Sequence, residues 1–179
     1  LIRIVAQTLA LSGAIRANGG LVDTGGSASG GSGGGIRIDV GTISGNGTIS
    51  ANGTPGGGTS GGGGGGGRIA IFYQNATGFN FANVSTFGVT GPNATNAGAG
   101  TVFLQGPSRE TGELIADNNN LAAPSLSTPI GASTSTLTLS NFRVRRGARA
   151  KLDSTLNLAG TLEITGAEFA AGNRILADT

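Results

Sequence analysis

The 179-residue sequence contains no cysteine, histidine, methionine or tryptophan, and these absences exclude several classes of function. Without cysteine the chain can form neither disulfides nor thiolate metal sites. Without histidine or cysteine it lacks the Ser-His-Asp and Cys-His arrangements of nucleophilic enzymes. We therefore predict that the protein holds neither a metal ion nor a cofactor.

Charged residues make up only 11% of the chain and aromatic residues 4%. The formal net charge of +2 is too small to predict a nucleic-acid partner. No apolar stretch reaches the roughly 18 residues that a membrane-spanning helix needs, so no membrane span is expected.

The nine carboxylates are scattered along the sequence. Glycoside hydrolysis would need two of them about 5–10 Å apart across a groove. Stacked strands could bring Asp153 and Glu163 together on neighbouring outward positions. Solubilising charges explain the carboxylates more simply, and we predict a protein that is not an enzyme.

Glycine is the abundant residue, with 36 copies. Residues 53–67 hold eleven glycines, of which seven are consecutive, and residues 19–35 hold nine. A glycine run has no side chains to bury and loses much conformational freedom when it becomes ordered. Such a run is either a flexible linker or a segment packed backbone to backbone against a neighbour, which satisfies its amides.

An internal repeat favours the packed alternative. Residues 1–20 match residues 35–54 at an offset of 34, with Ile-Arg-Ile near the start and Ala-Asn-Gly near the end of both copies. A third copy begins at Ile69, at an offset of 33, and then diverges. Both glycine-rich stretches therefore leave equivalent points of successive repeats.

Each repeat divides into short pieces of alternating, β-branched residues separated by glycine or Asn-Gly. This pattern predicts β-strands, and strands this short in a repeat of this length are typical of a solenoid. We predict an all-β fold, a right-handed parallel β-helix. The alternative for each Asn-Gly pair is a type I′ hairpin turn, but hairpins would not need a 34-residue repeat.

In this solenoid the two glycine-rich stretches should stack on one side as a layer of polyproline-II-like segments that pair through backbone amides. Asn18 and Asn52 should lie one above the other at a corner, where their amides can form a ladder. The glycines expected in the layer include Gly33, Gly34, Gly35, Gly61, Gly64 and Gly67.

We expect one continuous solenoid with three regions. Residues 1–105 form the glycine-rich coils, residues 106–134 an irregular connecting coil and loop, and residues 135–179 plainer coils made of closely spaced strands. Neither end has an evident polar cap. Because solenoids normally cap their ends, we expect either a fragment of a larger protein or subunits that stack head to tail.

Two sets of surface residues are candidates for contact or modification. A cluster of cations could be a solvated strand face that discourages edge pairing, or it could contact an anionic glycan, a lipid headgroup or an acidic neighbouring subunit. These cations are Arg143, Arg145, Arg146, Arg149 and Lys151. Asn75, Asn83 and Asn93 lie in Asn-x-Ser/Thr sequons and are candidates for glycosylation in a secreted protein.

The segments GGSGGGIRI, SGNGTISANG, GGGGGGGRIAIFY and GAGTVFLQ follow one another in order. With them, most of residues 1–105 resembles the glycine-rich parallel β-helix regions of large bacterial secreted and cell-surface proteins, of the adhesin or autotransporter-passenger kind. The resemblance implies an extracellular or cell-surface stalk, fibre or adhesive surface. We therefore expect a structural protein that self-associates into a fibre, filament or surface layer. The alternative is a glycan-binding adhesin or tailspike-like module that recognises a cell-surface glycan.

Overall fold

The computed structural model describes residues 1–21, 28–92, 96–121, 127–171 and 175–177, and for residues 170–171 and 175–177 it describes the backbone alone. Strands account for 52% of the structure and helix for 2%, which confirms the predicted all-β class. The helix is one 3₁₀ turn, η1 (Phe81–Asn83), begun by a hydrogen bond from the Ala82 amide to the Asn80 side chain.

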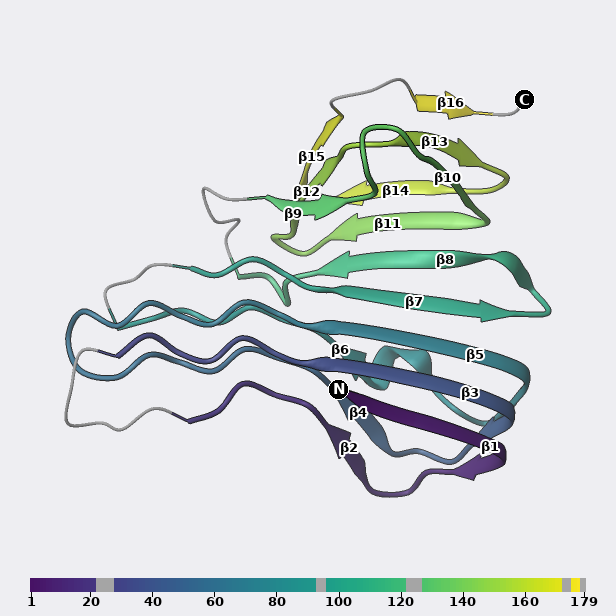
Figure 1. Ribbon diagram of the computed structural model, residues 1–179, viewed down its shortest axis with the longest axis horizontal. Coiled ribbons are helices and arrows are strands. Elements are labelled where there is room, and N and C mark those ends of the chain that lie inside the picture. Colours follow the sequence, from purple (N-terminus) through teal and green to yellow (C-terminus); the bar gives the residue numbers. More distant parts are fainter. Residues whose placement is uncertain (22–27, 93–95, 122–126, 172–174, 178–179) are drawn as a thin grey trace.

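The first half of the chain is a stack of parallel strands in a seven-stranded sheet (Figure 1). Ile2 lies opposite Ile36, Ile36 opposite Ile69, and Ile69 opposite Val102, so the sequence offsets of 34 and 33 residues are the register of the sheet. The strands in this part of the sheet are β1 (Ile2–Ala10), β3 (Gly35–Ser44), β5 (Arg68–Thr77) and β7 (Thr101–Gly106).

A smaller parallel sheet faces this stack. Its strands are β2 (Ala14–Arg16), β4 (Thr48–Ser50) and β6 (Val84–Ser85). The inward residues of the two sheets form the first core, because alternate side chains of a strand point to the same face. Ile38, Ile43, Ile49 and Ile71 in this core are completely buried.

The second half continues the large sheet and adds two further three-stranded sheets. The strands that continue the large sheet are β8 (Arg109–Asp117), β11 (Asn141–Arg145) and β14 (Leu162–Thr165). One added sheet consists of β9 (Thr128–Ile130), β12 (Arg149–Leu152) and β15 (Glu168–Ala171). The other consists of β10 (Thr136–Leu139), β13 (Thr155–Leu158) and β16 (Ile175–Ala177). Within these coils the register offset falls to 19–22 residues.

A hairpin joins the two halves and makes the large sheet mixed. We had predicted a wholly parallel solenoid, and this prediction is wrong at the hairpin. Strand β8 runs antiparallel to β7, because residues 107–108 are too short to carry the chain back for a parallel pairing. In this pair Val102 lies opposite Ile115 and Phe103 lies opposite Leu114. The first pair contributes to the first core and the second pair to a separate second core.

The two cores therefore lie on opposite faces of the shared sheet. Phe142 and Val144, which are fully buried, continue the face that holds Leu114 and form the centre of the second core. Both the direction of the strands and the buried face thus change at one hairpin.

Truncating a buried residue of the first core should cost far more stability than truncating an exposed one. Ile71→Ala removes a fully buried side chain and should lower the free energy of unfolding by about 2–5 kcal/mol. Val5→Ala acts on a side chain that is 68% exposed and should change it by less than about 0.5 kcal/mol. Urea denaturation measures both values, and equal losses would contradict the assignment of the core.

Candidate functional site

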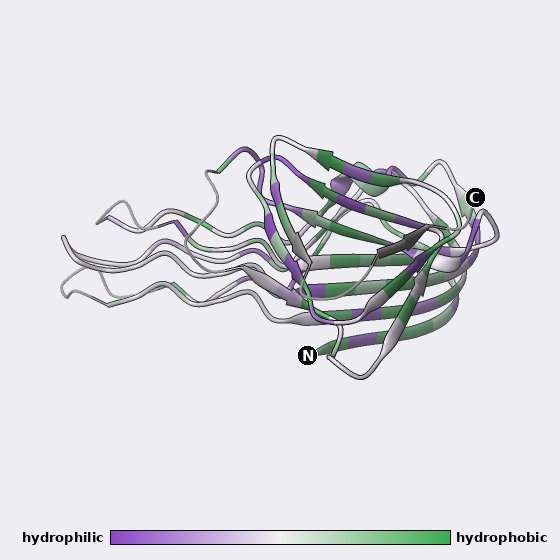
Figure 2. Cartoon of the chain, turned by 90° about the horizontal axis from the view of Figure 1, so that it is seen from above, coloured by the Kyte–Doolittle hydropathy of each residue, from purple (hydrophilic) through white to green (hydrophobic). Residues whose placement is uncertain are grey.

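The most unusual region is a bundle of glycine-rich segments that extend together from one end of the strands, at the left of Figure 1. Figure 2 shows the same pale segments leaving the strand stacks side by side. We call residues 17–21, 28–34, 51–57, 61–67, 86–91 and 96–100 the glycine layer. These segments lie between the strands of successive coils and carry almost no regular secondary structure.

Backbone hydrogen bonds connect the glycine layer in two directions. The central segment 61–67 bonds to four others. Its contacts are Gly33 N to Gly65 O at 2.9 Å, Gly64 N to Thr54 O at 2.9 Å, Val89 N to Gly64 O at 3.1 Å, and Gly66 N to Gly98 O at 3.0 Å. The glycine run is therefore a packed internal segment rather than a linker.

Close packing explains why these positions are glycine. A Cβ atom on Gly64 would lie 2.1 Å from the Gly31 carbonyl oxygen, and one on Gly67 would lie 2.0 Å from the Gly34 oxygen. Both distances are much shorter than any real carbon–oxygen contact, and neither glycine has a positive φ. The requirement is therefore space for the neighbouring backbone and not an unusual conformation.

The six glycines that we expected in the layer do not all play the same part. Gly33 and Gly61, like Gly64 and Gly67, lie against a neighbouring carbonyl, with ideal Cβ positions 2.0 and 2.3 Å from it. Gly34 is less crowded, at 3.3 Å from the Ala17 oxygen, and donates its amide hydrogen to that oxygen. Gly35 is the first residue of β3 and lies outside the layer.

The asparagine ladder is present, but its bonds run from side chain to backbone rather than between side-chain amides. Asn52 N donates to Asn18 Oδ1 at 2.9 Å, and Phe87 N donates to Asn52 Oδ1 at 2.8 Å. Asn118 extends the ladder, because its Oδ1 accepts from Gly88 N at 2.9 Å. Asn118 is completely buried. Sequence reasoning missed Asn118, because the internal repeat does not extend that far.

The five candidate cations are all paired with carboxylates. Arg143 pairs with Glu113 and Glu163, and Arg145 and Arg146 share Asp117. In the other sheets, Arg149 pairs with Glu168 and Lys151 with Asp153. These carboxylates therefore neutralise the cluster of cations. The sequence alone did not predict that they lie next to it.

Two of these carboxylates terminate the first core. The apolar column of Ile38, Ile71 and Leu104 is followed in the sheet by Glu113, which is only 3% exposed. Arg143 and Arg109 hold this carboxylate, and the hydrogen bond with Glu113 raises the pKa of Arg143 above its ordinary value. Glu113 and Asp117 lie where apolar residues would otherwise continue the first core. We call these two carboxylates and their partners Arg109, Arg143, Arg145 and Arg146 the charged cap.

Sequence reasoning missed Glu113 and Asp117. They flank Ile115 on alternate positions of one strand, and such residues usually face solvent. Only the register with β7 shows that this face continues the first core. Asp153 and Glu163 are not a pair, because Asp153 bonds Lys151 beside β12 whereas Glu163 lies on β14 and bonds Arg143.

The sequons have different surroundings. Asn75 lies exposed on β5. Asn83 donates its side-chain amide to the carbonyls of Asn46 and Gly47 in the previous coil, at 3.3 and 3.2 Å. An amide nitrogen used in this way is a poor acceptor for a glycan. Asn93 lies outside the described residues.

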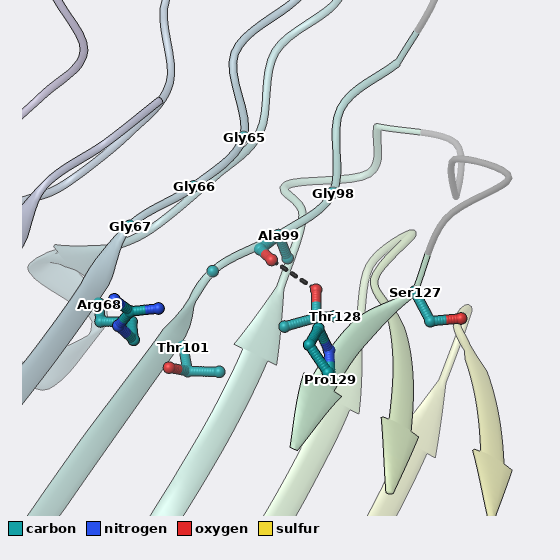
Figure 3. Close-up of a pocket in the computed structure, with 11 residues that line it drawn as sticks. Gly65, Gly66, Gly67, Arg68, Gly98, Ala99, Thr101, Ser127, Thr128 and Pro129 are labelled. Atoms are coloured by element: carbon teal, nitrogen blue, oxygen red, sulfur yellow. Dashed lines mark hydrogen bonds between the residues drawn. The ribbon is translucent and has the colours of Figure 1, made fainter. Parts of the chain in front are cut away.

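A shallow groove separates the glycine layer from the second stack (Figure 3). Its walls are the backbones of residues 65–67 and 98–100 and the side chains of Arg68, Thr101 and Thr128. Thr128 Oγ1 donates to the Ala99 carbonyl at 2.6 Å and ties the two walls together. Among the residues that the structure describes, neither a carboxylate nor an aromatic ring lines this groove.

Adding one methyl group to the centre of the glycine layer should reveal its packing. Gly64→Ala must displace a backbone carbonyl and should cost about 1–3 kcal/mol of unfolding free energy. Gly65→Ala is the matched control, because its Cβ would have its nearest neighbour at 3.7 Å. That change should be neutral or stabilising by up to about 1 kcal/mol, through a less flexible unfolded chain. Denaturant titration compares the two, and equal effects would indicate an unpacked segment.

Removing the buried carboxylate of the charged cap should destabilise the protein. Glu113→Ala breaks charge-assisted hydrogen bonds to Arg143 and Arg109 and should cost about 1.5–3 kcal/mol. Glu110→Ala removes an exposed carboxylate three residues earlier and should stay within about 0.5 kcal/mol of the parent. If both variants unfold at the same urea concentration, the cap contributes no more than ordinary surface charge.

Comparison with protein-family models, curated proteins and solved structures finds no match to this chain. Among the described residues, no helix is long and apolar enough to cross a membrane. The same residues contain no group of three or more acidic side chains placed to hold a metal ion. Function must therefore be inferred from the geometry of the chain itself.

Proposed function

We propose that the chain is a non-enzymatic structural module of an extracellular or cell-surface protein, and that it forms part of a fibre, filament or surface layer. The observation that carries the proposal is the glycine layer. Its central segment bonds backbone to backbone with four neighbours drawn from successive coils. Such a layer stiffens the stack. It also requires glycine at positions where backbones meet, which a binding or catalytic surface would not require.

We propose further that the stacks wind as right-handed parallel β-helices. Connections between parallel strands of one sheet are right-handed in about 98% of cases. At the β7–β8 hairpin the strand direction reverses and the buried face also reverses. Because strand direction and buried face reverse together, the second stack should wind with the same handedness as the first. We propose that the segments of the glycine layer, which are bonded to one another through their backbones, are polyproline-II-like.

Assembly can proceed through lateral contact between glycine layers or through head-to-tail stacking. In head-to-tail stacking, β14 of one copy would meet β1 of the next. The residues of β14 on the face of the first core are Glu163 and Thr165, whereas β1 presents Ile2 and Ile4 there. Copies stacked by translation alone would not match, whereas a copy turned by 180° about the stacking axis would bring Leu162 and Ile164 to this apolar surface. The glycine layer offers faces made largely of backbone and small residues.

The paired cations support a structural role over recognition of an anionic glycan. Arg143, Arg145 and Arg146 all bond carboxylates of the charged cap or of β14. An anionic glycan would have to share these guanidinium groups with the carboxylates that already neutralise them.

Assembly can be measured on the purified protein. We expect sedimentation velocity to show growth of the mean mass with concentration, and negative-stain electron microscopy to show filaments or sheets. Gly64→Ala should weaken this assembly more than Gly65→Ala, since only the former disturbs the packed layer. Isolated monomers at millimolar concentration would overturn the proposal.

A further inference from the structure

The smaller sheet of the first stack ends one coil before the large sheet does. Its last strand, β6, pairs with β4 on one edge, and no described strand pairs with its other edge. The large sheet continues from β7 into β8 because the hairpin at residues 107–108 leads directly from one to the other. Since β6 lies in the middle of the chain, its free edge does not depend on where the chain begins or ends.

This edge of β6 carries backbone groups placed for a further strand. The Ser85 carbonyl accepts from Ala51 N at 2.9 Å, so Ser85 directs its backbone toward β4. Neighbouring residues of a strand direct their backbone groups to opposite edges, so Val84 and Thr86 direct theirs away from β4. The Thr86 carbonyl agrees with this, since it accepts from Gly100 N at 2.7 Å. The Val84 carbonyl and the Thr86 amide are thus placed to pair with an extended segment.

A groove with a volume of about 310 Å³ lies beside this edge. Its apolar part is formed by Phe81, Val84, Val102 and Ile115. In the preceding coil the residue opposite Val84 is Ile49, which is completely buried. The groove is therefore placed for one more apolar side chain in this column, and its volume is at the lower end of the range for ligand pockets.

The groove also carries a net positive charge. Arg145 and Arg146 line it and share one carboxylate, Asp117, with N–O distances of 2.8 Å. Two guanidinium groups against one carboxylate leave one positive charge, whereas Arg143 has two carboxylate partners. The side chains of Arg145 and Arg146 are 31% and 42% exposed. Both therefore have donors available for a further anion.

The backbone of Arg146 supports a role for its side chain. Its φ of 51° lies in a region that residues other than glycine rarely adopt. Glycine would adopt this φ without strain. From this position the guanidinium group reaches Asp117 and lies 5.7 Å from the centre of the Phe87 ring. Strain that aims a charged side chain at a groove is typical of functional sites.

We propose that the groove beside β6 binds an extended peptide segment of another protein, with an apolar residue followed two positions later by a carboxylate. The segment runs parallel to β6, as β4 does. Alternate residues of an extended segment face the same side. An apolar side chain beside Val84 therefore places the carboxylate beside Thr86, next to Phe87 and the arginine that lies over it. Such a partner goes beyond the structural role proposed above, because it attaches a second protein to the module.

A short peptide based on the smaller sheet tests this site. The probe is an acetylated and amidated peptide with the sequence of residues 47–52 and the change Ala51→Glu, which places a carboxylate two positions after Ile49. The control peptide carries Ala51→Gln. NMR titration of the ¹⁵N-labelled full chain reads binding at the amides of residues 84–86 and at the Nε groups of Arg145 and Arg146.

We expect the Glu peptide to bind at least about tenfold more tightly than the Gln peptide, because the carboxylate alone forms charge-assisted hydrogen bonds with the arginines. Arg146→Asn in the protein should remove most of this difference, and asparagine tolerates a positive φ. Arg3→Gln removes an exposed cation on β1 that does not line the groove, and it should leave the difference unchanged.

Equal affinities of the two peptides, or signal changes confined to residues outside the groove, would overturn the inference. Octanoate has an apolar tail and a carboxylate but no peptide backbone. If it bound as tightly as the Glu peptide, pairing with β6 would contribute nothing and the inference would be wrong. Should Arg146→Asn fail to fold, added salt in the parent protein gives the same comparison: it should reduce the preference for the Glu peptide, and an unchanged preference would contradict the assignment.

Discussion

The close approach of backbone to backbone around residues 61–67 is the constraint on which the first stack depends. At Gly64 and Gly67 the space that a side chain would occupy is filled by a carbonyl of the previous coil. The segment can therefore bond to four neighbours at once. These bonds hold the coils on either side at a constant spacing. The isoleucines of successive strands lie opposite one another at the same spacing.

The end of the first core shows a second constraint, which concerns charge. Where the chain turns back at residues 107–108, the sheet continues but the smaller sheet facing it does not. Glu113 and Asp117 occupy the face that apolar residues would otherwise cover, and arginines from β8, β11 and the following turn neutralise them. Leu114 and Ala116 of β8, with Phe142 and Val144 of β11, lie on the other face and belong to the second core.

Much of this fold could be predicted from the sequence, because a repeat gives register directly. The match of Ile2 with Ile36 and then Ile69 is both a sequence offset and a strand pairing. The antiparallel hairpin could not be predicted in this way, since it occurs once and has no copy to compare. The ion pairs of Arg143 and Arg145 were missed for the same reason: their partners on β8 are brought near by that hairpin.

The shared sheet also bears on how such a protein can change in length. The hairpin separates a part built from 33- and 34-residue units from a part with coils of 19–22 residues. A gene segment encoding one whole unit could be duplicated or lost within the first part without altering the hairpin or the second stack. Gain or loss of whole units would then change the reach of the protein in fixed steps, while the hairpin and the second stack stay the same.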